Sequence, residues 1–167
     1  MLLRCCLYAF WLLAFGFIPS ASASSQSKVD LVVVNKSESR MSVYRDGKII
    51  KTYAIAMGDM PTGHKLTEGD QRTPQGRYIL DYKKSDSAFY KSIHISYPND
   101  EDKLRAKALG ISPGGMIMIH GENPRSTLSP EEAQKFNWTN GCIAVTNKEM
   151  DELWQLIDEG TPIEIWP

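Results

Sequence analysis

The residue in this chain best suited to covalent chemistry is Cys142, which lies between a glycine and an apolar, β-branched run in NWTNGCIAV (137–145). A cysteine nucleophile needs a base to form its thiolate, a group that orients the base, and donors that stabilise an oxyanion. Gly141 precedes the cysteine, and a glycine lets a substrate approach the backbone amides closely. The alternative interpretation is an ordinary turn glycine beside an inert, buried thiol.

Three histidines are available as the base: His64, His94 and His120. His120 ends the apolar segment MIMIH (116–120) and is followed by a glycine, so we expect its imidazole at the mouth of a strand. Cys142 begins the next predicted strand, which would place both side chains at the same end of a sheet. A purely structural histidine is also compatible with this spacing. Because the histidines are scattered, with no carboxylate or thiol at ligand spacing, we predict no metal and no cofactor.

Residues 1–23 have the layout of a secretory signal peptide. Arg4 supplies a positive charge, residues 5–18 form an apolar run too short to span a bilayer comfortably, and ASA (21–23) is a small-residue cleavage site. We therefore expect an exported protein of the periplasm or cell envelope, with mature residues 24–167 and no transmembrane span after signal removal. An uncleaved N-terminal anchor is the alternative.

Removal of the signal peptide would change both the cysteine inventory and the charge. Cys5 and Cys6 would leave with it, so Cys142 alone would remain and no internal disulfide would be available. An exposed lone thiol is a liability in an oxidising compartment, which favours chemical use of Cys142. The formal net charge of −1 would become −2 when Arg4 leaves, and that balance does not indicate a nucleic-acid partner.

The predicted elements are mostly strands, with a hairpin at Asp46-Gly47. Capping boxes at Ser129 and Thr146 predict two helix starts, and a third helix is expected over 100–109. Strands are expected over 30–34, on both sides of the hairpin turn (41–58), and over 76–84, 92–97, 116–120, 142–146 and 162–166. This pattern predicts a mainly antiparallel β domain with peripheral helices and long, function-bearing loops.

Several separate motifs resemble the L,D-transpeptidase catalytic domain family, the YkuD-type fold. HG (120–121) and TNGCI (139–143) resemble the family pattern of His-Gly, a spacer and Ser/Thr-His-Gly-Cys, followed by an apolar residue and usually arginine. Upstream, GDQRTPQGRY (69–78) resembles the family's Thr-Pro-x-Gly segment, and GGMIMIHG (114–121) fits the strand before the histidine. The motifs follow the family's order, and the resemblance covers essentially all of 24–167.

The resemblance implies a mainly β, YkuD-like β-sandwich with short peripheral helices. It implies Cys142 as nucleophile, His120 as base, the Gly121 carbonyl as the group that orients the imidazole, and the amides of Gly141 and Cys142 as oxyanion donors. The implied partners are peptidoglycan stem peptides. Attack on the carbonyl of the L-centre of diaminopimelate would expel D-alanine, and an amine of a second stem would then form a cross-link. Water in place of that amine would make the protein an L,D-carboxypeptidase.

Two positions depart from the family pattern: Asn140 replaces the second histidine, and Ala144 replaces the arginine. Asn140 still donates and accepts hydrogen bonds, whereas Ala144 cannot bind a carboxylate. We expect Arg72, or less favourably Lys65 or Arg77, to supply that charge. A small branch of the family also reads Gly-Cys-Ile-Ala-Val. Some relatives hydrolyse, including ones that release envelope proteins from peptidoglycan, so a peptidoglycan-linked envelope protein is an alternative partner.

Three further residues are candidate cleft residues: Trp138, His94 and Tyr97. Trp138 precedes the catalytic turn and either walls the cleft or packs under its loop. Relatives carry a similar Ser-Tyr-Pro-Asn run near the site, so His94 and Tyr97 are candidate substrate contacts, with an exposed strand face as the alternative for His94. His64 is expected to face solvent.

Papain-type and NlpC-type peptidases place the cysteine before the histidine, contrary to the order here. A non-catalytic envelope-binding module remains the alternative to an enzyme.

Overall fold

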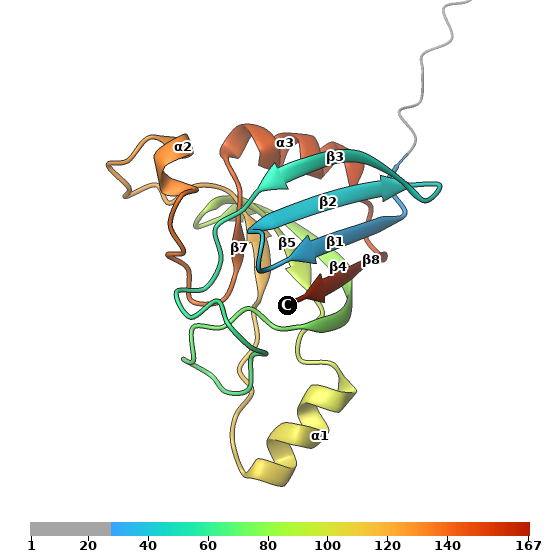
Figure 1. Ribbon diagram of the computed structural model, residues 1–167, viewed down its shortest axis with the longest axis vertical. Coiled ribbons are helices and arrows are strands. Elements are labelled where there is room, and N and C mark those ends of the chain that lie inside the picture. Colours follow the sequence, from blue (N-terminus) through green and yellow to red (C-terminus); the bar gives the residue numbers. More distant parts are fainter. Residues whose placement is uncertain (1–27) are drawn as a thin grey trace, which may run out of the picture.

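The described part of the computed structural model, residues 28–167, consists mainly of strands joined by long loops, as predicted (Figure 1). The predicted signal peptide lies outside the described residues. The strands are β1 (Leu31–Asn35), β2 (Arg40–Arg45), β3 (Lys48–Ala54), β4 (Gly76–Ser87), β5 (Tyr90–Ile95), β6 (Met118–His120), β7 (Ile143–Ala144) and β8 (Thr161–Trp166). The helices are α1 (Asp100–Leu109), α2 (Pro130–Ala133) and α3 (Asn147–Leu156).

All eight of these strands belong to one sheet with the order β3-β2-β1-β8-β4-β5-β6-β7. Most neighbours are antiparallel, but β1–β8 and β6–β7 are parallel pairs. A parallel pair needs a long crossover connection, and for β6 and β7 this is the loop that carries α2. The parallel pairing of β6 with β7 was not predicted, and it determines how the two candidate catalytic residues face each other.

The two ends of the sheet meet. The two edge strands of the sheet are β3 and β7. Ala56, in the segment that follows β3, forms a β-bridge with Ala144 of β7. A second bridge joins Gly58 to Thr139, just before Cys142. We call these two bridges the seam. The sheet therefore curls back on itself, and the turn that carries the cysteine lies where it closes.

The predicted turn and cap signals are largely confirmed. Asp46 and Gly47 both have positive φ, 50° and 70°, as a tight hairpin turn requires. The side chains of Ser129 and Thr146 accept hydrogen bonds from the amides of the third residues of α2 and α3, in two complete capping boxes. The helix over 100–109 is confirmed as α1. The helix α2 is short and ends at Ala133.

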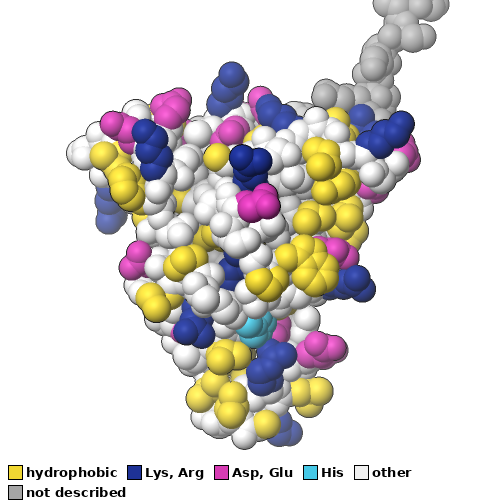
Figure 2. Space-filling model, viewed as in Figure 1, with side chains coloured by type: hydrophobic (Ala, Val, Ile, Leu, Met, Phe, Trp, Pro, Cys, Tyr) yellow, Lys and Arg dark blue, Asp and Glu magenta, His cyan; other side chains and the backbone are white. Residues whose placement is uncertain are grey.

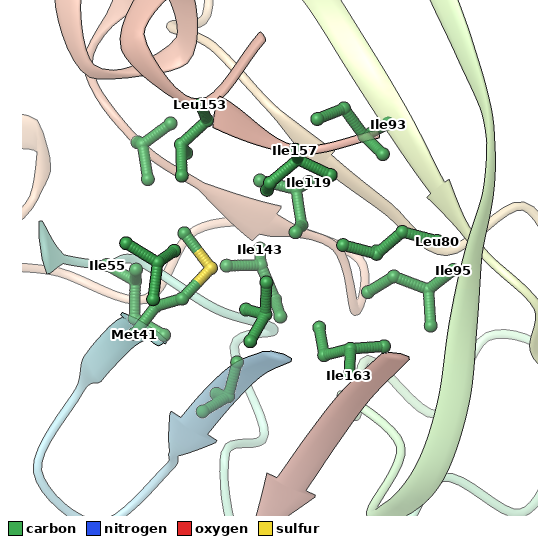
Figure 3. Close-up of a cluster of buried hydrophobic side chains, with 14 of the residues drawn as sticks. Met41, Ile55, Leu80, Ile93, Ile95, Ile119, Ile143, Leu153, Ile157 and Ile163 are labelled. Carbon is green, nitrogen blue, oxygen red and sulfur yellow. The ribbon is translucent and has the colours of Figure 1, made fainter. Parts of the chain in front are cut away.

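The core lies between the curled sheet and α3 (Figure 3). Leu153 and Ile157 from the helix region pack with Ile119 of β6 and Ile143 of β7, and all four are 0% exposed. Burial of each such side chain contributes about 1.5–3 kcal/mol to stability. Because side chains alternate along a strand, turning Ile119 and Ile143 into the core directs their neighbours His120 and Ala144 to the opposite face.

None of the helices within residues 28–167 has the length and apolar character needed to cross a membrane. Figure 2 shows hydrophobic side chains gathered on the surface at the α1 end of the molecule. Leu104, Leu109 and Ile111 are exposed in this region.

Candidate active site

The parallel pairing of β6 and β7 brings His120 and Cys142 together. His120 is in register with Ala144, and Cys142 lies two residues before Ala144. Ideal strand spacings then place the Cα atoms of His120 and Cys142 roughly 8 Å apart. The expectation that they lie at the same strand end is wrong, because β6 ends at His120 whereas β7, running in the same direction, begins after Cys142. Both strands are so short that the two residues are neighbours nevertheless.

The imidazole of His120 is held in one orientation by the backbone. Nδ1 lies 2.7 Å from the carbonyl oxygen of Gly121. A carbonyl only accepts, so Nδ1 carries the proton and Nε2 of the neutral ring keeps its lone pair. The side chain is buried, at 3% exposure. Burial lowers the pKa of His120 below its ordinary value, and the hydrogen bond to Gly121 offsets only part of that shift. A neutral imidazole is the form that accepts a proton.

Gly121 is a glycine for steric reasons. A Cβ atom at this position would lie 2.4 Å from Oδ1 of Asn147 and 3.1 Å from the carbonyl oxygen of Phe89. The Gly121 amide donates to that same Phe89 carbonyl at 3.0 Å. The carbonyl that orients His120 is therefore fixed by packing on both sides.

Aromatic rings enclose the imidazole. The ring centroids of Phe89 and His120 are 4.6 Å apart, and the Trp138 ring meets His120 edge-on at 5.7 Å. Trp138 thus packs against the candidate base, and it lines a separate cavity with Leu128 and Phe136 rather than the cleft that Cys142 lines. Its Nε1 atom is buried, with no hydrogen-bond partner among the described residues. The rings exclude water from the imidazole, which is the physical cause of its lowered pKa.

The turn before Cys142 is braced by the hydroxyl of Thr139. This oxygen accepts from the Gly141 amide at 3.1 Å and donates to the Cys142 carbonyl at 2.7 Å. The Gly141 amide, expected as an oxyanion donor, is thus already committed. The Cys142 amide has no acceptor among residues 28–167, which makes it the available donor. Thr139 was seen in the sequence only as part of the family motif, without this role.

Close packing of three segments fixes this turn. Gly141 has φ of +119°, and a Cβ atom there would lie 2.6 Å from the backbone oxygen of Arg72. A Cβ atom on Gly58 would lie 2.0 Å from the backbone oxygen of Gln71. The Gly58 amide donates to the hydroxyl of Thr73, which is 0% exposed. The segment of the Thr-Pro motif therefore packs against the turn and fixes its position. Gly58 is a site residue that the sequence analysis missed.

The Cys142 thiol is partly exposed and opens onto a cleft of about 400 Å³. The residues that line the cleft are Lys65, Glu68, Gly69, Gln71, Gly114, Gly115, Met116, Ile117, Asn140 and Cys142. Asn140 lines this cleft together with Cys142. In this structure Sγ donates to the Met116 carbonyl at 3.6 Å, and no hydrogen bond among the described residues joins it to His120. Proton transfer would need a rotation of the thiol toward the imidazole, a rearrangement common in enzymes without substrate.

Burial favours the neutral forms of both the thiol and the imidazole. Burial raises the pKa of Cys142, although a hydrogen bond from the Met118 backbone and the positive charge of Lys65 partly counteract this shift. Together with the lowered pKa of His120, this disfavours a preformed thiolate–imidazolium pair. The arrangement suits transfer of the thiol proton to the base at the moment of attack.

Other candidate residues lie outside the cleft lining. The Arg72 guanidinium lies beside Gly63, so only its backbone contacts the turn. Arg77 is paired with Glu164 at 3.0 Å. His94 Nδ1 is 2.7 Å from Asp81. Tyr97 is buried, donates to the Pro113 carbonyl at 3.0 Å and is not among the residues that line the cleft.

His64 is not directed freely to solvent, as was expected, but belongs to a polar cluster that we call the α1 corner. Its Nε2 lies 3.0 Å from Oδ1 of buried Asp102, and its Nδ1 accepts from the Gln75 amide at 2.9 Å. Asp102 also accepts from Tyr78 at 2.9 Å and from Arg105 at 2.9 Å. A cavity of about 790 Å³ adjoins this cluster. The residues that the structure describes contain no group of three or more His, Cys, Asp and Glu side chains suited to a metal.

Comparison with known proteins agrees with this geometry. The YkuD family model, described as the L,D-transpeptidase catalytic domain, matches residues 30–165. YqjB of Bacillus subtilis is 29% identical over 138 residues, which cover 80% of this chain and 69% of YqjB. YafK of Escherichia coli K12 is 29% identical over 112 residues, which cover 66% of this chain and 38% of YafK. The names of both relatives place them among the L,D-transpeptidases.

Solved structures are similar as well. The helical cell shape determining protein Pgp2 of Campylobacter jejuni superposes with a TM-score of 0.62 at 29% identity, covering 84% of this chain and 48% of Pgp2. An Enterococcus faecium L,D-transpeptidase (C442S mutant) shares the fold, with a TM-score of 0.56 at 16% identity and coverage of 84% and 50%. The chain therefore spans about half the length of these two solved proteins. Over the part that it shares with them, the chain belongs to the L,D-transpeptidase catalytic domain family, with the YkuD-type fold.

Proposed function

We propose that this protein is an exported, cysteine-dependent peptidoglycan L,D-transpeptidase that acts on stem peptides through a Cys142 acyl-enzyme. The observation that carries the proposal is the pairing of His120 Nδ1 with the Gly121 carbonyl at 2.7 Å, on the strand beside the cysteine. That hydrogen bond leaves Nε2 free to accept the thiol proton. Family membership supplies the substrate class.

The first half of the reaction acylates the thiol. Nε2 of His120 takes the Sγ proton as the sulfur bonds to the carbonyl carbon of the L-centre of diaminopimelate. The Cys142 amide stabilises the oxyanion that forms on the carbonyl oxygen. When this intermediate collapses, the carbon–nitrogen bond breaks and D-alanine leaves, its nitrogen taking the proton back from His120. The stem peptide is then held on the cysteine as a thioester.

The second half transfers the acyl group. An amine of a second stem attacks the thioester carbonyl with its nitrogen. His120, neutral again, accepts a proton from that nitrogen. The carbon–sulfur bond breaks, the thiol recovers the proton, and a cross-link is formed. With water as the attacking group, the same steps yield a free acid, as in an L,D-carboxypeptidase or an amidase that releases a peptidoglycan-linked protein.

One observation favours hydrolysis as the second candidate. Ala144, at the position of the family's usual arginine, is 0% exposed and packed in the bridge with Ala56. The cationic contact usual in the family is therefore missing from that position, and the acceptor would be held differently. The proposed place of action is the cell envelope, since residues 1–23 have the layout of a signal peptide.

The test is incubation of the mature protein with disaccharide-tetrapeptide, with Cys142→Ala as the control, and analysis of the products by mass spectrometry. Dimers joined between two diaminopimelate centres, with loss of D-alanine, would establish transpeptidation. Tripeptides alone would establish hydrolysis. If Cys142-dependent products are absent both from this substrate and from protein-linked peptidoglycan, the proposal is wrong and a non-catalytic envelope-binding module becomes the better interpretation.

A further inference from the structure

The cleft around Cys142 contains one cationic side chain among the described residues that line it, and this is Lys65. Lys65 is 3% exposed, which is unusual for a lysine, since this residue type is almost never fully buried unless it is paired. A buried ammonium in a cleft beside a nucleophile is a recognition group for an anionic ligand, provided that its hydrogen-bonding capacity is not exhausted.

The ammonium of Lys65 has one donor to spare. An ammonium carries three N–H groups. Two of them are used, one by Oδ1 of Asp70 at 2.8 Å and one by the Thr67 carbonyl at 3.1 Å. Among the described residues no third acceptor is present. The remaining N–H is therefore available to a group bound in the cleft.

Asp70 holds Lys65 in place and is itself held by hydrogen bonds from three backbone amides. Its Oδ2 accepts from the amides of Leu66 and Thr67, and its Oδ1 accepts from the Arg72 amide as well as from Lys65. Burial alone would raise the pKa of Asp70, but these hydrogen bonds outweigh it and lower the pKa to about 2. The loop thus presents a fixed ammonium, which limits the entropy lost when a ligand binds.

We propose that Lys65 binds the terminal carboxylate of the D-amino acid that leaves the stem peptide. This inference rests on the proposed function, because that function places a free carboxylate one residue beyond the bond attacked by Cys142. The arrangement favours Lys65 over Arg72, whose guanidinium lies beside Gly63 and outside the cleft lining. Glu68, on the cleft wall, is the one acidic residue that opposes such a ligand there among the described lining residues.

The first test does not depend on turnover. Iodoacetate and iodoacetamide alkylate thiols by the same displacement of iodide, but only iodoacetate carries a carboxylate. The rates at which both modify Cys142 are measured by intact mass in the wild type, Lys65→Gln, Lys65→Arg and Arg72→Gln. Loss of the cation in Lys65→Gln should lower the iodoacetate rate relative to the iodoacetamide rate by about fivefold, while Lys65→Arg and Arg72→Gln keep the wild-type ratio.

An unchanged ratio in Lys65→Gln, a fall in Arg72→Gln instead, or a Cys142 that neither reagent modifies would overturn the proposal. Lys65→Gln can still hydrogen bond to Asp70, and Lys65→Arg keeps the charge. Circular dichroism of each variant verifies that the domain is folded. A general disturbance of the loop would slow both reagents together and leave the ratio unchanged, so a merely structural role of Lys65 is distinguished from carboxylate binding.

The second test uses the tetrapeptide substrate and its C-terminal carboxamide. The wild type should process the free acid with a kcat/KM about tenfold or more above that of the amide, and Lys65→Gln should process both equally. Equal use of both substrates by the wild type would overturn the proposal. If no stem peptide is turned over but the alkylation ratio still depends on Lys65, the cation site stands and the proposed function fails.

Discussion

The α1 corner and the edge formed by β6 and β7 each contain a histidine with a fixed hydrogen bond, but they use their polar groups differently. At the α1 corner, His64 has a carboxylate partner, Asp102, which also binds Tyr78 and Arg105. At the edge, His120 has only a backbone carbonyl. The more elaborate hydrogen-bond network is therefore the one away from the cysteine.

The two regions differ in how far their hydrogen-bonding groups are satisfied. Both ring nitrogens of His64 are engaged, whereas Nε2 of His120 has no hydrogen-bond partner among residues 28–167. Near it, the Nε1 atom of Trp138 and the hydroxyl of Ser92 are also buried without partners in that part of the chain. Ser92 is the cross-strand neighbour of His120. A buried group without a partner costs stability. The described residues contain such groups elsewhere too, for example the hydroxyl of Tyr53 on β3, so an unpartnered group alone does not mark a functional region.

The largest effect expected from this comparison is on acylation. His120→Gln removes the acceptor of the thiol proton and should slow formation of a carbapenem adduct on Cys142 by about 10²–10⁴-fold. His64→Gln, at the α1 corner, should change that rate by no more than about threefold, since surface and structural substitutions act mainly on stability. Adduct formation is followed by intact mass. Equal slowing in both variants would show that the two histidines do not differ in role.

The second effect is on stability. Here the larger loss is expected at the α1 corner and the smaller one at the edge formed by β6 and β7. Asp102→Ala removes a buried carboxylate with several hydrogen bonds and should lower the free energy of unfolding by about 3–5 kcal/mol. Cys142→Ala removes one sulfur from a turn and should cost less than about 1 kcal/mol. Urea unfolding of the two variants measures both values. A larger loss for Cys142→Ala would contradict the distinction between a saturated and an unsaturated region.

A glycine pair sharpens the comparison at the level of the backbone. Gly141 and Gly110, the C-cap of α1, both have positive φ, at 119° and 65°. A Cβ atom on Gly110 meets nothing within 4 Å, whereas one on Gly141 would lie 2.6 Å from the Arg72 oxygen. Gly110→Ala should therefore cost about 1 kcal/mol, and Gly141→Ala about 2–3 kcal/mol. Only Gly141→Ala should also slow acylation, as the same adduct measurement would show. A normal acylation rate in Gly141→Ala would mean that the seam does not position the thiol.

The smallest expected effect is in the pH dependence. Burial lowers the pKa of His120, so the imidazole stays neutral and able to accept a proton as the pH falls through the ordinary histidine value near 6.5. The acylation rate should hold between pH 7.5 and about 6.5 and decline only below that range. His64→Gln should leave the position of this decline unchanged. A decline that begins above pH 7, or one that moves in His64→Gln, would assign the titrating group elsewhere.

Local signals predicted much of the fold. The Asp46-Gly47 hairpin and the caps at Ser129 and Thr146 depend on residues close in sequence, and the structure confirms them. The sequence placed His120 and Cys142 near each other through an expected common strand end, whereas the structure brings them together through the parallel pairing of two short strands. Family resemblance was needed to suggest the Gly121 carbonyl, since nothing in the spacing of residues identifies a backbone acceptor.

Features that depend on contacts between distant segments were not predictable. The hydroxyl of Thr139 takes up the Gly141 amide only because the turn adopts one particular conformation. Lys65 rather than Arg72 faces the cleft because of the path of the long loop between β3 and β4. The contact of half-buried His64 with Asp102 depends on α1, whose position relative to that loop is a tertiary property. Periodicity and capping rules contain no information about such contacts.

The seam has a consequence for the order of folding. Its two bridges, Ala56–Ala144 and Gly58–Thr139, join parts of the chain separated by most of the domain, and such contacts form late because long loops must close first. A partly folded chain would therefore contain the thiol without the turn that positions it. We expect reactivity of Cys142 toward a carbapenem to appear only with the last refolding phase. The thiol would then stay unreactive until the domain has folded completely.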